Sequence, residues 1–127
     1  LIATGLFFIG WSFLVWVAGR AVTIAVENNS GIITKLVTTL FGLTAVWQFN
    51  NVLNFVPWNF AGAGHSLAVL KNSGTELSAR SEAFVNMTGS SAAEVPQFSL
   101  IPSDPIILIF ILSALYLVVG RLWVGNK

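Results

Sequence analysis

The first stretch of the chain, from Leu1 to Gly19, contains no charged side chain, and its apolar character continues past Arg20 as far as Val26. At about 1.5 Å of rise per residue, a helix over this stretch would be long enough to cross roughly 30 Å of hydrocarbon. Only 9% of the residues are charged and 55% are hydrophobic, whereas soluble domains carry roughly 25% charged residues. We therefore expect an integral membrane protein built mainly from apolar helices.

A second apolar run begins at Ile32, after the residues 27–31, which favour a turn. We expect this run to end at Val56, because Pro57 disfavours helical geometry in the residue before it. The turn between the two runs is short, so the two helices should pack as an antiparallel hairpin.

A third apolar run follows Pro105 and carries no charge from Ile106 through Val119. Proline in the first turn of a helix costs no hydrogen bond, and the carboxylate of Asp104 favours the positive N-terminal end. The sequence thus predicts three membrane-spanning helices, over residues 2–26, 32–56 and 105–124.

The segment 58–104 is more polar, being rich in Gly, Ser, Asn and Thr. Ser73 and Glu76 have the spacing of a capping box, and Gly89 could end a helix that starts there. We therefore predict a short amphipathic helix over about residues 75–88.

A β-hairpin that turns at residues 72–74 is the competing prediction for the same segment. With either element, the predicted fold class is an all-α membrane protein: a hydrophobic helical hairpin, a polar extramembrane segment containing a short helix or hairpin, and a C-terminal hydrophobic helix. The corresponding divisions of the chain are 1–57, 58–104 and 105–127.

The basic residues indicate an orientation, because Lys and Arg collect on the cytoplasmic side of membrane proteins. With three spans, the first turn and the C-terminus lie on one side, and the segment 58–104 lies on the other side with Leu1. An external N-terminus, and a first residue that is Leu and not Met, would both fit a cleaved leader. Four of the six basic residues fall on the predicted inside: Arg20, Lys35, Arg121 and Lys127.

Few residues could carry catalysis or hold a metal. The chain has no Cys, and His65 is its single histidine. A membrane metal or haem site normally takes more than one strong ligand from a chain, and Ser66 beside His65 would point away from it. We expect no catalytic residue, no metal and no cofactor other than bound phospholipid. The net charge of +1 also does not predict sequence-specific nucleic-acid binding.

Arg20 is the one charge inside an otherwise apolar span. Such a group either extends toward the headgroups, or contacts lipid phosphate or a water-filled lumen. Arg20 is therefore a candidate for lipid binding or for lining a lumen, and Lys35 lies on the other side of the same turn.

The second helix carries three polar side chains on one face, at spacings of four and three: Thr44, Gln48 and Asn51. Polar groups in a membrane helix need partners on another helix or water. They are predicted either to join helices within one subunit, or to contact another subunit or line a wet channel. Asn86 is the candidate glycosylation site, because Asn86-Met87-Thr88 is a sequon on the predicted outer segment.

The hairpin of residues 1–26 and 32–56, with Arg20 and Lys35 flanking its turn, resembles the pilins of conjugative, type IV secretion-type mating pili. The resemblance is one of architecture and covers under half of the chain. It implies a processed membrane protein that assembles into a helical tube with lipid between its subunits, and it implies that the charges near the turn face lumen and headgroups. The insert 58–104 and the third helix depart from the minimal pattern of these pilins.

The first functional hypothesis is therefore a structural subunit that forms a homo-oligomer in the cell membrane through its apolar helices, with membrane lipid as partner. A pilin for DNA transfer, extruded as an extracellular filament, is its specific form. The alternatives are an accessory transmembrane subunit of a respiratory or transport complex, and a small pore-former.

Overall fold

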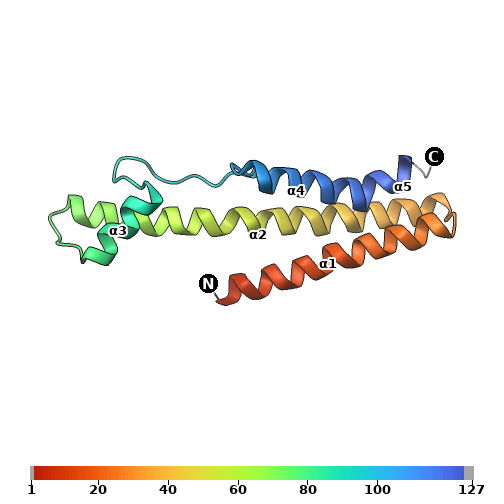
Figure 1. Cartoon of the computed structure of the whole chain (residues 1–127), viewed down its shortest axis with the longest axis horizontal. Coiled ribbons are helices and arrows are strands. Elements are labelled where there is room, and N and C mark those ends of the chain that lie inside the picture. The colour runs from red at the N-terminus through yellow and green to blue at the C-terminus, as the bar shows by residue number, and fades with distance from the viewer. Residues whose placement is uncertain (1, 125–127) are drawn as a thin grey trace. The chain divides into compact units, whose positions relative to one another are not determined.

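The computed structural model describes residues 2–124, and Leu1 and Lys127, on which the orientation above partly rests, lie outside the described residues. Over the described residues the chain is helical and contains no strand, so the predicted all-α class is confirmed and the β-hairpin alternative is wrong. Three stretches are long and apolar enough to cross a membrane: the first helix, the second helix and residues 105–124. The elements, drawn in Figure 1, are α1 (Ile2–Glu27), α2 (Ile32–Asn72), α3 (Ala79–Thr88), α4 (Pro105–Leu115), the π-helical turn η1 (Tyr116–Gly120) and α5 (Arg121–Val124).

Hydrogen bonds between backbone groups stabilise the turn that ends helix α1. Asn29 adopts a left-handed conformation, with φ of 47°. The amide of Ser30 donates to the carbonyl of Ala25 at 3.0 Å, and the amide of Asn29 donates to that of Val26 at 3.1 Å. This pair of bonds is the Schellman arrangement, which satisfies carbonyls that a helix end leaves free. The short connection between the first two helices is therefore as predicted.

The predicted end of the second helix at Val56 is wrong, because α2 passes through Pro57 and ends at Asn72. A proline inside a helix removes one hydrogen bond and crowds the carbonyl four residues earlier. Ending the helix there would instead free several backbone groups, which is more costly in apolar surroundings than the loss of one bond. At about 1.5 Å per residue, the 41 residues of α2 extend for about 60 Å, twice the hydrocarbon thickness.

The start of α3 also differs from the prediction. Its N-cap is Ser78, whose hydroxyl accepts a hydrogen bond from the amide of Ser81 at 3.2 Å, and the helix begins at Ala79. The Ser73 hydroxyl, which the capping box would have used, instead donates to the carbonyl of Leu70 at the end of α2. The predicted end is confirmed, because Gly89 caps the helix in a left-handed conformation.

Helix α4 begins as predicted, with the Asp104 carboxylate accepting from the amide of Ile106 at 2.8 Å and Pro105 in the first turn. The π-helical turn η1 that follows was not predicted. At Gly120 the ring of Tyr116 lies where a side chain would stand, since a Cβ there would be 2.7 Å from ring atom Cδ2. The helical stretch continues through η1 into α5, and the π-helical hydrogen bonds of η1 alter its register.

The contacts divide the chain into two compact units, which we call unit 1 (Leu1–Leu53 with Leu100–Lys127) and unit 2 (Asn54–Ser99), so that the boundary lies within α2. In unit 1, α1 and the α4–η1–α5 run pack on the N-terminal part of α2 (Figure 1). Small side chains allow close approach, most of all Gly42, where a Cβ would stand 2.9 Å from the carbonyl oxygen of Val118. The buried residues of this core are Ala18, Ala45, Val46, Phe49, Ile111, Ala114 and Val118.

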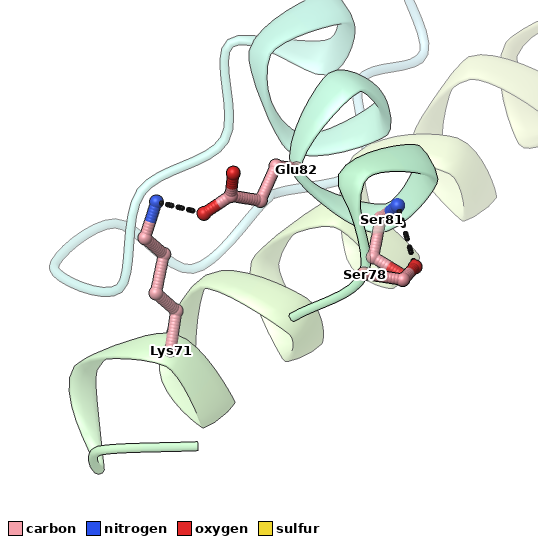
Figure 2. A network of polar contacts seen from close by, with 4 residues as sticks. All are labelled: Lys71, Ser78, Ser81 and Glu82. Atoms are coloured by element: carbon pink, nitrogen blue, oxygen red, sulfur yellow. Dashed lines mark hydrogen bonds and ion pairs between the residues drawn. The ribbon is translucent and has the colours of Figure 1, made fainter. Parts of the chain in front are cut away.

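In unit 2, the last turns of α2 and the helix α3 form a hairpin. A strip of non-helical chain follows α3. Figure 2 shows the Lys71 ammonium reaching the Glu82 carboxylate across the turn, at 2.7 Å, and Ser78 at the start of α3. The strip is held to α2 by the Trp58 indole N–H, which donates to the carbonyl of Pro96 at 3.2 Å. Polar bonds to backbone atoms and the ring contacts Trp58–Phe98 and Phe60–Phe84 thus join the parts of this unit.

Candidate functional site

The turn between α1 and α2 forms one wall of a pocket of about 370 Å³. Its charged side chains come from three elements, because Glu27 ends α1, Lys35 lies in the first turn of α2, and Arg121 begins α5. Lys35 and Arg121 are partly buried, whereas Glu27 is exposed. Within residues 2–124, none of the three forms an ion pair. The remaining lining residues are Ala25, Val26, Asn29 and Leu122.

Local backbone structure sets the positions of these cations. The amide of Lys35 donates to the carbonyl of Gly31 at 3.1 Å, which fixes the first turn of α2 directly after the left-handed Asn29. Arg121 follows the π-helical turn and stands beside Leu122, which is buried with Val22 and Ala25 of α1. The first turn and the C-terminal helix therefore meet at one end of unit 1, as a three-span chain requires.

Arg20 does not share this pocket with Lys35. It is exposed on α1 and lines a separate apolar groove of about 310 Å³ between α1 and the α4–η1 run. The two hydroxyl groups of the groove are bonded within their own helices, that of Thr23 to the carbonyl of Gly19 and that of Ser113 to the carbonyl of Ile109. Within the described residues Arg20 has no ion-pair partner.

The predicted polar face of α2 contains three different environments. The hydroxyl of Thr44 donates to the carbonyl of Leu40 in its own helix, at 2.9 Å. Gln48 is partly buried. The side-chain Oδ1 of Asn51 is buried and has no hydrogen-bond partner among the described residues. An unsatisfied buried acceptor costs about 1–3 kcal/mol, and a partner subunit or a water molecule could recover it. The role of these residues in helix or subunit contacts stays a prediction.

Sequence reasoning did not single out Asn50, which is 8% exposed. Its amide donates to the carbonyl of Leu100 at 2.8 Å and so holds the approach to α4 against α2. This contact forms one wall of a groove of unit 1, of about 690 Å³, whose lining is almost wholly apolar. The signal was present in the pair Asn50-Asn51, because a polar side chain in a membrane helix needs a partner. The partner's identity depends on tertiary contact.

The polar candidates of unit 2 are held by separate local bonds. His65 donates through Nδ1 to the carbonyl of Ser91 at 2.7 Å, whereas the neighbouring Ser66 hydroxyl donates to the carbonyl of Gly62. The two side chains are therefore not bonded to each other. Asn86 is exposed in the last turn of α3, so its amide is accessible, and its glycosylation stays a prediction. Among residues 2–124 there is no group of three or more side chains that could hold a metal ion.

No family model matches the chain, and neither a curated protein nor a solved structure is significantly similar to it.

Proposed function

We propose that this chain is a structural membrane subunit, which associates with its own copies through α1 and retains lipid in the grooves between its helices. The supporting observation is how little of α1 is covered. Of the residues in its most apolar 18-residue stretch, 6% are buried. In the whole helix, only Ala18, Val22 and Ala25 are buried in unit 1.

Small residues on α1 favour a second helix as the cover, in addition to lipid. Gly5, Ser12 and Gly19 recur at intervals of seven, so that they lie along one face of the helix. Open space lies beside both glycines, where a Cβ would have no neighbour within 4 Å. Small residues at such positions let two membrane helices approach closely.

The charged and polar groups that lack partners support the same proposal. An Arg in lipid without a counter-charge costs at least about 2.5 kcal/mol at the bilayer centre, and less near the interface. Assembly or bound phospholipid would supply a partner for Arg20, and a neighbouring subunit would supply a donor for Asn51. The specific form of the proposal is a mating-pilus pilin, in which Arg20 and Lys35 contact lipid headgroups or a lumen.

A second candidate function is an accessory transmembrane subunit of a larger complex. Unit 2 favours it, because its own bonds, such as that from Trp58 to Pro96, order an additional surface that a minimal pilin hairpin lacks. Such a surface could contact other proteins of a complex.

The test is the mass and shape of the native particle after extraction in a mild detergent, measured by light scattering and electron microscopy. The proposal predicts a homo-oligomer or filament of this one chain. Gly5→Leu should shift it toward the monomer, whereas the control Gly10→Leu, about 140° away around α1 at 3.6 residues per turn, should not. A constant ratio to other subunits would instead establish the accessory role.

Asn51 gives an independent readout of assembly. If a neighbouring subunit donates to its Oδ1, Asn51→Leu should weaken the oligomer. An isolated subunit should instead become more stable, by about 1–3 kcal/mol, because the unsatisfied acceptor is removed. In unfolding titrations, Asn51→Leu should therefore lower the stability above the concentration at which the subunits assemble, and raise it below that concentration.

A further inference from the structure

We propose that the pocket at the α1–α2 turn binds the phosphate of an anionic phospholipid, with Lys35 and Arg121 as its two cations. The inference rests on the proposed role as a lipid-retaining membrane subunit and names the lipid class and the site. It differs from the pilin expectation, in which Lys35 acts with Arg20, because Arg20 lines another groove.

The charges in the pocket carry the argument. Lys35 and Arg121 come from different helices, both are partly buried, and neither forms an ion pair within residues 2–124. Because the two cations line one pocket, an anion bound in it would be attracted by both. With Glu27 included, the net charge of the lining is +1, which matches one phosphodiester.

The chemistry of the two cations suits a phosphate group. A guanidinium presents paired N–H groups that bind two phosphate oxygens, and an ammonium acts as a compact point charge. Lys35 also lies in the first turn of α2, where the helix dipole favours an anion. Basic pockets between membrane helices on the cytoplasmic side bind the headgroups of acidic lipids.

Apolar surroundings favour a lipid over free phosphate. Val26 and Leu122 line the pocket next to the cations. Three residues from each cation, and so on the neighbouring face of its helix, Ile32 is 59% exposed and Val124 is 66% exposed, and both can receive acyl chains. The indole of Trp123 is fixed there by its N–H bond to the Thr39 hydroxyl, at 2.9 Å. Tryptophan concentrates at the level of the headgroups, which is the depth at which a lipid phosphate lies.

The experiment uses the full chain, purified in detergent, stripped of native lipid and offered mixed micelles of phosphatidylglycerol and phosphatidylcholine. Native mass spectrometry counts the lipid retained. The parent chain should prefer phosphatidylglycerol. Lys35→Gln and Arg121→Gln should each lower its retention about fivefold, given about 1 kcal/mol per basic residue at a membrane surface.

Two further variants separate the pocket from general electrostatics. Arg80→Gln removes the same charge from unit 2 and should leave retention unchanged. Glu27→Gln removes the competing carboxylate and should increase retention. Equal retention by the parent, Lys35→Gln and Arg121→Gln would overturn the site. An effect of Arg80→Gln as large as theirs would overturn it as well.

Inorganic phosphate distinguishes the two sources of the anion. It should not displace the bound lipid at millimolar concentration, and displacement would overturn the assignment to a lipid. The mass of the protein particle, read from the same spectra, tests assembly separately. A monomer that still prefers phosphatidylglycerol through this pocket would refute the proposed assembly alone, and an oligomer without lipid preference would refute this inference alone.

Discussion

Unit 1 and unit 2 are both helical, but most of the buried apolar residues lie in unit 1. In unit 1, α2 meets the C-terminal helix through Gly42 and a small apolar core, and Val118 is 1% exposed. In unit 2, α2 is joined to the following chain by polar bonds, such as those of Trp58 and His65 to backbone carbonyls, and by the ring contacts Trp58–Phe98 and Phe60–Phe84. Lipid is as apolar as a side chain and gives little drive for association, so membrane helices depend on close packing. Polar bonds to backbone groups add about 0.5–1.5 kcal/mol each to the order of a segment that buries few apolar residues.

The largest effect is expected in the core of unit 1, at Phe49. Its ring is 4% exposed and lies 5.4 Å from that of Phe8 and 5.7 Å from that of Phe110, measured between ring centroids. Phe49→Ala should destabilise unit 1 by up to about 3 kcal/mol, the low end of the range for Phe→Ala in soluble cores, because lipid or detergent can fill part of the gap. Near-ultraviolet circular dichroism during denaturation in detergent measures the loss. Phe13→Ala, at an exposed position, is the control and should change little.

Gly42→Ala should have the second-largest effect on stability, because one added methyl group would crowd the backbone of Val118. Overpacking of this kind costs about 1–3 kcal/mol. Gly62→Ala is the matched control in the same helix, since a Cβ there would have no neighbour within 4 Å, and should stabilise α2 by about 0.8–1.0 kcal/mol through helix propensity. Equal effects of the two variants would show that close packing does not hold unit 1 together.

The architecture could be predicted because each decisive pattern is local. Uninterrupted apolar runs predicted the spans, and Asp104 and Gly89 predicted helix ends through groups a few residues away. Pro57 misled the prediction, because proline weakens a helix without ending it when the residues on both sides remain helical. Ser73 misled it for another reason, since two helix ends competed for the same hydroxyl.

The candidate sites were less predictable, because they depend on contacts between distant parts of the chain. The basic residues near the turn were recognised from the sequence. That Lys35 shares a pocket with Arg121, and not with Arg20, follows from how α5 packs on α1. Asn50 and Asn51 are adjacent and identical in sequence. Only the tertiary structure gives the first a carbonyl partner and leaves the Oδ1 of the second without one.

Within unit 2, Gly64→Ala should have a smaller effect than Gly42→Ala. Its Cβ would meet the hydroxyls of Thr88 and Ser90, which are ends of side chains and not backbone. Displacing them would weaken the bond from Ser90 to the carbonyl of Ala61, for a loss of about 1 kcal/mol. Faster amide hydrogen exchange around α3, with no change in unit 1, is the expected readout, and a global effect would contradict the separation of the two units.

The smallest effect is expected for the ion pair between Lys71 and Glu82, whose side chains are 58% and 45% exposed. Exposed pairs contribute about 0–1 kcal/mol and are screened by salt. Lys71→Gln should therefore lower protection of α3 slightly at low salt and not at high salt. A loss that persists at high salt would mean that the pair does more than close the turn.

The most direct test of the central claim, that the exposed apolar surface of unit 1 faces lipid, uses the absence of native Cys in this chain. Met87 in unit 2 is 74% exposed and Ile109 in unit 1 is 64% exposed, so folding alone covers neither. Single variants Met87→Cys and Ile109→Cys would be exposed to a membrane-impermeant maleimide in vesicles opened to give access from both sides. The account predicts rapid labelling at position 87, protection at position 109, and equal labelling of both after denaturation in SDS. Equal labelling in the undenatured membranes would contradict it.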